Sequence, residues 1–156
     1  MSSNDKNPKI SYECGALLKQ IHDMTEKHAN NSLRGIGLTL SQMHVLLALH
    51  NEPGQTLSMK ELEKHLLVAQ STTFGLISRL EQKGFVEIVP DAADRRVKLV
   101  KLTASGNDCV SGSDVKRREM ETLLLSSLTA SEQKEFFRIL TKVRDTLRSN
   151  TVEGEE

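Results

Sequence analysis

The sequence contains few of the residues that mark secreted, membrane or disulfide-linked proteins. Its 156 residues include no Trp, one Tyr and four Phe, so the core must be built from aliphatic side chains. Two cysteines are too few for a disulfide framework, and no apolar stretch approaches the ~20 residues of a membrane span. The first residues show no signal-peptide pattern. We therefore expect a cytoplasmic protein with no part in a membrane.

The sequence also lacks an excess of charge of either sign. It has 21 Lys and Arg residues against 21 Asp and Glu residues, which excludes binding to nucleic acid through bulk positive charge. The distribution is uneven, because residues 58–102 hold eight basic and six acidic groups, whereas residues 103–156 hold eight basic and ten acidic groups. Any contact with nucleic acid must come from a local cluster in the middle of the chain.

The first half of the sequence has the periodicity of helices. Apolar residues repeat at helical spacing over 10–29, and we expect 30–32 and 35–37 to end that helix. Ser41 is a suitable N-cap for the next helix. The sequence Ser58-Met59-Lys60-Glu61 predicts a capping box that opens a short helix, which is followed by a second helix over 70–82.

The pattern then changes to strands and returns to helices. Residues 85–89 and 97–102 are typical of two strands joined by a charged turn. Thr103 can cap the following helix, and Thr129 with Glu132 forms a second capping box. The last helix carries an apolar stripe of Phe136, Leu140, Val143 and Leu147. The order of elements predicts a mainly α protein that contains a winged helix-turn-helix, a fold whose second helix can enter the major groove.

Several motifs in this order resemble the MarR (multiple antibiotic resistance regulator) family. They are Leu38-Thr39-Leu40-Ser41-Gln42, Leu80-Glu81-Gln82-Lys83-Gly84-Phe85-Val86, Asp91-Ala92-Ala93-Asp94-Arg95-Arg96 and Leu102-Thr103-Ala104-Ser105-Gly106. The resemblance covers about residues 10–148. It implies a homodimeric transcription regulator that binds pseudo-palindromic double-stranded DNA and is released by a ligand or an oxidant. The alternative is a winged helix that only binds proteins.

The expected organisation has a single domain over 10–148. Its winged helix-turn-helix spans 38–103, and its dimerisation helices lie in 10–35 and 104–148. Apolar stripes so far outside the winged region would stay exposed in a monomer, which favours pairing across a two-fold axis. We expect residues 1–9 to be mobile and 149–156 to form an acidic tail.

The resemblance implies that the charged turn between the two strands contacts DNA. Arg96 is similar to the family's minor-groove arginine, and Asp94 to the acid that orients it. The alternative is an ordinary surface ion pair in a turn, which would stabilise the protein by less than ~1 kcal/mol. Arg95 and Lys98 are expected to contact phosphates, or else only solvent.

The second helix of the motif presents small polar groups off its apolar stripe. The residues expected to contact DNA are Gln70, Ser71, Thr72, Phe74, Ser78 and Arg79. Phe74 can meet a thymine methyl or belong to the core, and Arg79 can contact a phosphate or form an ion pair. The helix departs from the family pattern at Gly75, usually a larger residue, and at Ala69, usually a capping residue.

An effector site is expected in the crevice between the dimerisation helices and the winged domain. Its expected lining suits a small apolar or aromatic molecule, although the same residues can be ordinary core: Leu17, Ile21, Met24, His28, Met43, His44 and Leu47. Cys14 offers a redox alternative, since some members of the family it resembles sense peroxides near this position with tyrosine partners, but a small buried or partly buried cysteine is the simpler interpretation. The only tyrosine is Tyr12, two residues away.

No pattern indicates an enzyme or a cofactor. The sequence has no nucleophile–base arrangement and no phosphate-binding glycine loop. Five histidines raise the possibility of metal sensing, but a closed Zn site needs about four ligands, and His44 and His50 are not at helical spacing. We therefore predict no metal site.

Overall fold

A computed structural model of the chain describes residues 8–152, with side chains described over 13–150. The chain divides into two compact units, residues 1–117 and residues 118–156, and each is described by itself. The boundary falls inside α5. Most of the N-terminal segment expected to be mobile (1–9) and the end of the expected acidic tail (149–156) lie outside the described residues. The expected domain boundaries stay a prediction.

The described elements follow one another in the order expected for a winged helix. They are α1 (Pro8–Leu33), the 3₁₀ turn η1 (Arg34–Ile36), α2 (Leu40–Asn51), the 3₁₀ turn η2 (Pro53–Gln55), β1 (Thr56–Ser58), α3 (Met59–Leu66), α4 (Gln70–Gln82), β2 (Val86–Pro90), β3 (Lys98–Leu102), α5 (Ala104–Leu125) and α6 (Ala130–Val152). The mainly α fold class is confirmed. None of the helices in residues 8–152 is long and apolar enough to cross a membrane.

The predicted break of the first helix at residues 30–32 is wrong. The helix α1 continues to Leu33, which is buried, and only then gives way to η1 and to Gly37 in the left-handed region at φ 68°. Asn30 does not end the helix because its side chain has another partner: its Oδ1 accepts a hydrogen bond of 2.7 Å from the amide of Leu40, the first residue of α2.

The N-cap of α2 is Thr39 and not Ser41. The Thr39 hydroxyl accepts a hydrogen bond of 3.3 Å from the Gln42 amide, and the Gln42 Oε1 accepts one of 3.1 Å from the Thr39 amide. This is a complete capping box, and its Thr-x-x-Gln spacing was available in the sequence.

The other predicted caps are confirmed. The Ser58 amide and hydroxyl each donate to Glu61 Oε2 at 2.7 Å, and these bonds, the backbone one first, lower the pKa of the Glu61 carboxyl. Thr129 holds Glu132 at 2.8 Å in the same way, with the same effect on the pKa of Glu132. The Thr103 hydroxyl accepts from the Gly106 amide at 3.0 Å at the start of α5.

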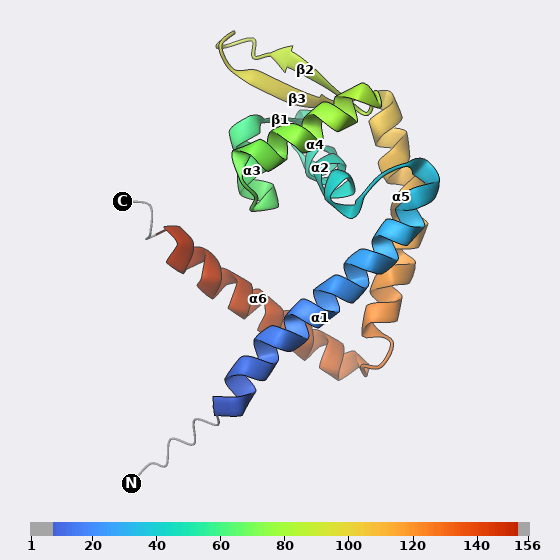
Figure 1. The fold of residues 1–156 in the computed structure, drawn as a ribbon, viewed down its shortest axis with the longest axis vertical. Coiled ribbons are helices and arrows are strands. Elements are labelled where there is room, and N and C mark those ends of the chain that lie inside the picture. Colours follow the sequence, from blue (N-terminus) through green and yellow to red (C-terminus); the bar gives the residue numbers. More distant parts are fainter. Residues whose placement is uncertain (1–7, 153–156) are drawn as a thin grey trace. The chain divides into compact units, whose positions relative to one another are not determined.

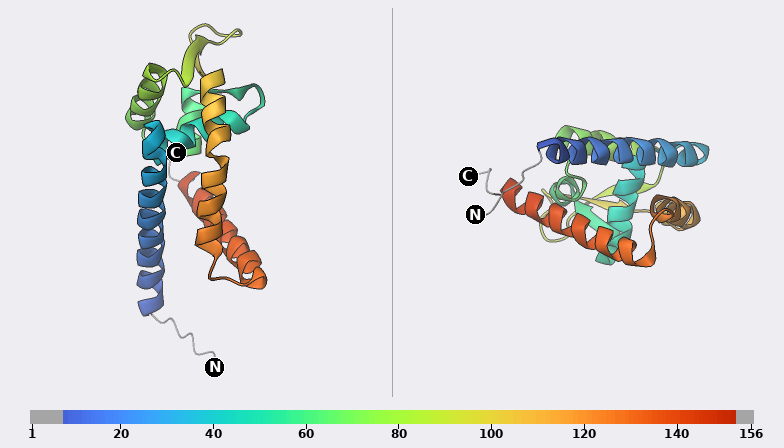
Figure 2. Two further views of the ribbon diagram at one scale, coloured as in Figure 1. Left: turned by 90° about the vertical axis from the view of Figure 1, so that its right-hand side faces the viewer. Right: turned by 90° about the horizontal axis from the view of Figure 1, so that it is seen from below.

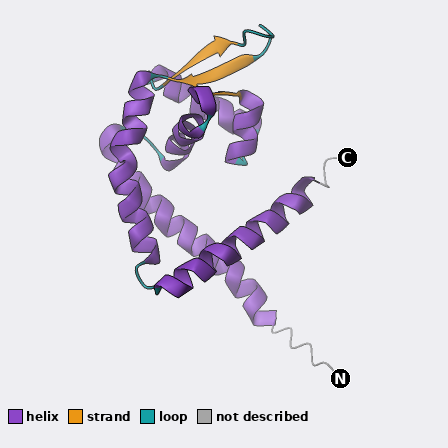
Figure 3. Ribbon diagram, turned by 180° about the vertical axis from the view of Figure 1, so that it is seen from behind, coloured by secondary structure: helices purple, strands orange, loops and turns teal. Residues whose placement is uncertain are grey.

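The sheet has three antiparallel strands in the order β1-β3-β2 (Figure 3). The predicted hairpin forms with Val86 opposite Leu102 and Pro90 opposite Lys98. The strand β1, only three residues long, was not predicted from the sequence, and it pairs Leu57 with Val100 on the other edge of β3. The central strand β3 is therefore bonded on both sides.

The core of the first unit lies between this sheet and the helices α2, α3 and α4, which gather below it in Figure 1. It is aliphatic, as the composition predicts, and its fully buried members include Val45, Leu46, Leu49, Leu62, Leu80 and Val100. The hairpin of β2 and β3 extends beyond the helices (Figure 2). The core therefore fixes α4 while leaving the tip of the hairpin outside.

Gly106 sits where α5 begins against the residue that precedes β2. A Cβ at this position would overlap the Phe85 carbonyl oxygen and lie 2.7 Å from Leu102 Cδ1. Because a backbone carbonyl cannot move aside as a side-chain end can, only glycine fits. The glycine that closes the Leu102–Gly106 motif is thus explained by close approach of two backbones.

We expect Gly106→Ala to lower the free energy of unfolding by about 1–3 kcal/mol, the usual cost of overpacking. Gly112→Ala is the matched control, because Gly112 lies in the same helix with nothing within 4 Å of an added Cβ. That change should raise stability by up to about 1 kcal/mol. Urea unfolding at one fixed protein concentration measures both, and equal effects of the two substitutions would contradict the packing argument.

Candidate DNA-binding interface

The helix α4 buries one face and exposes the other. Thr73, Leu76, Ile77 and Leu80 are buried, whereas Gln70, Ser71, Thr72, Phe74 and Arg79 are exposed and Ser78 is half-buried. Ala69 occupies the N-cap with no side-chain hydrogen bond, as its departure from the family pattern predicts. The exposed face carries an amide, hydroxyls and one cation, all suited to base edges or phosphates.

The structure bears on the two open roles of α4 residues: whether Phe74 belongs to the core, and whether Arg79 forms an ion pair within the chain. Phe74 is 62% exposed, so it is not a core residue and remains available for an apolar contact. Arg79 forms no ion pair with any residue in the described part of the chain. Its guanidinium is therefore free to bind an anion from outside the chain.

The tip of the hairpin holds Arg96 in a fixed orientation. The Arg96 Nε and Nη2 donate to the two carboxylate oxygens of Asp94 at 3.1 Å each, and the Arg96 amide donates to Asp94 Oδ1 at 3.0 Å. These bonds, the side-chain pair first, lower the pKa of Asp94. The Arg96 side chain nevertheless stays 92% exposed, so the ion pair directs the guanidinium without covering it.

The turn that carries this pair is closed by its own backbone. The Val97 amide donates to the Asp94 carbonyl and the Asp91 amide to the Val97 carbonyl, both at 2.9 Å. Arg95 and Lys98, on either side of Arg96 and Val97, are exposed. The tip therefore presents a compact group of cations at the end of β2 and β3.

A cavity of about 530 Å³ separates α4 from the hairpin, a feature that the sequence did not indicate. Phe74 and Ile77 line it from α4, and Ile88, Val100 and Lys98 line it from the strands. Its walls are mainly apolar. Both predicted DNA-contacting elements thus border one hollow on the same side of the first unit.

The expected effector residues have unequal environments. Met43 is 1% exposed and belongs to the core, which corrects its assignment to a pocket wall. Leu17, Met24, His28 and His44 are exposed, and Ile21 and Leu47 are half-buried. None of the seven lines the cavity beside α4 or a second cavity of about 370 Å³ between the end of α1 and α5.

The two cysteines lie in different surroundings. Cys14 is exposed on α1, so the expectation of a buried or partly buried cysteine is wrong. The side chain of Tyr12 lies outside the described residues, and the redox alternative stays a prediction. Cys109 is half-buried in α5, where burial raises the pKa of its thiol and disfavours the reactive thiolate.

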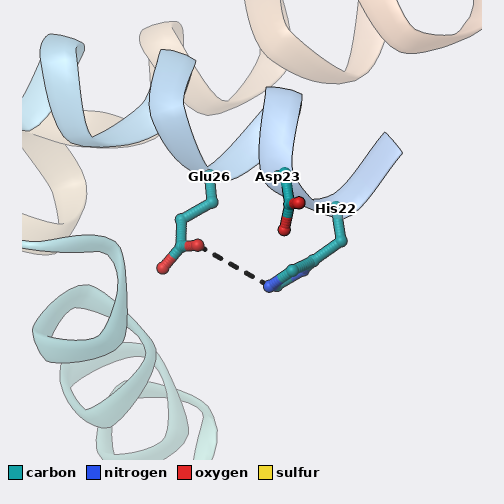
Figure 4. A group of neighbouring side chains, drawn as sticks. All are labelled: His22, Asp23 and Glu26. Atoms are coloured by element: carbon teal, nitrogen blue, oxygen red, sulfur yellow. Dashed lines mark ion pairs between the residues drawn. The ribbon is translucent and has the colours of Figure 1, made fainter. Parts of the chain in front are cut away.

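One group of side chains capable of binding a metal was not found in the sequence. His22, Asp23 and Glu26 bring their ligand atoms within 4.8 Å of one another on α1 (Figure 4). The spacing of the histidines does not indicate this group, because two of its members are carboxylates. The spacing i, i+1, i+4 on one helix was the available signal.

Comparison with known proteins agrees with the winged-helix geometry. A sequence model of the MarR family matches residues 36–97. The chain is 33% identical over 137 residues to the transcriptional repressor NicR of Pseudomonas putida, covering 88% of this chain and 85% of that protein. A match to the transcriptional activatory protein BadR of Rhodopseudomonas palustris is 38% identical but spans only 51% of that protein's length.

Solved structures give the same result. A complex of MepR from S. aureus with DNA has a TM-score of 0.79 at 28% identity, covering 85% of this chain and 96% of that chain. BpsR of Bordetella bronchiseptica, whose DNA binding is regulated by 6-hydroxynicotinic acid, has a TM-score of 0.76 at 26% identity, covering 84% and 92%. The relatives are transcription regulators and not enzymes. The chain belongs to the MarR family of DNA-binding transcriptional regulators.

Proposed function

We propose that this protein is a homodimeric repressor that binds a pseudo-palindromic operator and is released by a small molecule. The observation that carries the DNA-binding part is the exposed Arg96 held by Asp94 through two side-chain hydrogen bonds at the hairpin tip. An arginine fixed in this way can enter the minor groove, where the negative potential is concentrated. A binder of proteins alone would not need that arrangement.

In this proposal α4 enters the major groove. Gln70, Ser71, Thr72, Phe74 and Ser78 face base edges or the sugar-phosphate backbone, with Phe74 placed for a thymine methyl. Arg79, Arg95 and Lys98 neutralise phosphates. Gly75 supplies no side chain, so sequence discrimination depends on its neighbours and on the minor-groove contact of Arg96.

The dimer is supported by apolar surface in each unit taken separately. In the first unit, α1 exposes Leu17, Leu18 and Met24. In the second unit, α6 exposes Phe137, Ile139, Leu140, Val143 and Leu147. Apolar side chains at this density are typical of an interface. Pairing of two chains would place two copies of α4 at half-sites one helical turn apart, ~10 bp.

Release by a small molecule is supported by the regulation of BpsR by 6-hydroxynicotinic acid. We propose that the effector binds beside α1 and α2, against a wall formed by Leu17, Ile21, Met24, His28, His44 and Leu47, without the buried Met43. Such a wall suits a small apolar or aromatic molecule. The proposed location of the protein, with its chromosomal target, is the cytoplasm.

We expect Arg96→Ala to weaken operator binding by about 1–3 kcal/mol and to reduce the salt slope of binding by about one. Asp94→Asn should cost less and leave the slope unchanged, because the positive charge of Arg96 remains while its orientation is lost. Fluorescence anisotropy with a labelled operator over a salt series measures both. Lys27→Ala, which removes an exposed charge on α1, is the control. Equal binding by Arg96→Ala and wild-type protein would refute the minor-groove role.

We expect the wild-type chain to have a solution mass of about 35 kDa, twice its 17.4 kDa. Leu140→Asp should shift it toward the monomer, because a carboxylate would be buried in the α6 interface. Lys142→Asp, two positions along and therefore on another face of the helix, should stay dimeric. Sedimentation equilibrium distinguishes the two, and a monomeric wild-type protein would contradict the dimer.

We expect an aromatic acid such as 6-hydroxynicotinic acid to lower the operator affinity of the wild-type protein. Met24→Glu should abolish this response while preserving DNA binding, because a negative charge enters the proposed apolar wall and repels the carboxylate of the acid. Ala16→Glu is the control, because Ala16 is exposed and, as the residue next to Leu17, faces another direction on α1. Anisotropy titrations of the protein–DNA complex with the acid test this. An unchanged response in Met24→Glu would remove the site from α1.

A further inference from the structure

The C-terminal end of α4 is fixed around Lys83 by hydrogen bonds of the backbone. Gly84 follows Lys83 in the left-handed region at φ 76°, and its amide donates to the Glu81 carbonyl at 2.9 Å. The Phe85 amide donates to the carbonyl of the buried Leu80 at 3.0 Å. These two bonds form a Schellman motif, which ends a helix in a defined geometry. The backbone of Lys83 is therefore joined rigidly to α4.

The side chain of Lys83 reaches the segment that joins α1 to α2. Its Nζ donates to the carbonyl of Gly37, the residue that ends η1, and lies 3.5 Å from Oε1 of Gln42. Gln42 is 3% exposed, and its Oε1 also accepts the amide of Thr39 in the capping box of α2. One ammonium group thus contacts both the end of η1 and the start of α2, which lie 46 and 41 residues away in the sequence.

The same segment is held from two other elements. Asn30 of α1 accepts the Leu40 amide at 2.7 Å, and Lys116 of α5 donates from its Nζ to the Ser32 carbonyl at 3.0 Å. The carbonyls at the end of a helix carry partial negative charge, which favours cations there. The segment is thus bonded to α1, α4 and α5, and Lys83 supplies the bond to α4.

We propose that Lys83 is a positioning residue for DNA binding, because its bond to the Gly37 carbonyl fixes the end of α4 to the segment between α1 and α2. The buried stripe holds one face of α4 in the core, and a hydrogen bond at the end of the helix restrains it from rocking about that stripe. This role rests on the proposed function, in which α4 enters the major groove.

The geometry separates this role from a phosphate contact. The side chains of α4 that are proposed to contact DNA lie between Gln70 and Arg79, whereas Lys83 follows the last residue of the helix. Its Nζ is already bonded to a carbonyl within the chain. Loss of the Lys83 ammonium should therefore alter the placement of α4 without removing a cation that contacts DNA.

Fluorescence anisotropy over a salt series, with a labelled operator selected by the wild-type protein, measures the consequence for DNA binding. We expect Lys83→Met to weaken binding about three- to tenfold, the effect of one lost hydrogen bond, with an unchanged salt slope. Lys83→Arg should restore the affinity, because a guanidinium can donate to the same carbonyl. The controls are Gln82→Met, at the preceding exposed position, and Lys116→Met, which removes an equal charge and leaves the bond to α4. Both should bind within about twofold of wild type.

Hydrogen–deuterium exchange of the free protein tests the same bond without DNA. We expect Lys83→Met to speed exchange at residues 38–42 and in the last turn of α4, because both lose a restraint. Lys116→Met should leave exchange in the last turn of α4 unchanged. Circular dichroism checks that every variant keeps its helices.

Three results would overturn the positioning role of Lys83. The first is a salt slope lower by about one in Lys83→Met, which would make Lys83 a phosphate contact. The second is wild-type affinity or wild-type exchange in Lys83→Met, and the third is an equal loss of affinity in Lys116→Met. Arg96→Ala and Phe74→Ala, measured in the same assay, separate this outcome from the proposed function. If both weaken binding and Lys83→Met does not, the role of Lys83 alone fails, and if none of the three weakens binding, the proposed function fails with it.

Discussion

Burial of one face of α4 is the constraint from which the proposed DNA-binding surface follows. Thr73, Leu76, Ile77 and Leu80 are buried in the core that fills the space between the sheet and the helices α2 and α3. Because this apolar face is held in the core, the opposite face of α4 must point to solvent. The small polar side chains of α4 and the aromatic ring of Phe74 lie on that opposite face and are therefore exposed.

The hairpin is positioned by the same core through β3. This strand pairs with β1 on one side and β2 on the other, and its Val100 and Leu102 are buried. The close backbone contact at Gly106 joins the start of α5 to the residue preceding β2. The charged tip between the strands therefore extends from a rigid base, and within it Asp94 fixes the direction of Arg96. A chain with no net charge can bind DNA in this way, through few cations held in place.

The sequence predicted the features that depend on local chemistry. Capping boxes at Ser58 and Thr129, the hairpin and the apolar face of α4 each follow from spacing within a few residues. Predictions from the sequence were wrong or missing where a residue's structure depends on a partner far away in the chain. Asn30 stays helical because it bonds to Leu40, β1 exists only because β3 lies beside it, and Met43 is core because of its neighbours. The same holds for the candidate site. The charged tip could be predicted because it lies in one short segment, whereas the cavity beside α4 is formed by α4 and the strands together and could not be predicted.

We propose that two copies of this chain bind DNA together, each through α4 and its hairpin tip. The apolar surfaces of α1 and α6 are the physical reason to expect a pair. Hydroxyl-radical footprinting of a selected operator tests the claim most directly. We expect two protected segments related by a two-fold axis and centred about 10 bp apart, each flanked by minor-groove protection from the hairpin tip. A single unpaired protected segment, or protection that Arg96→Ala leaves unchanged, would contradict the account.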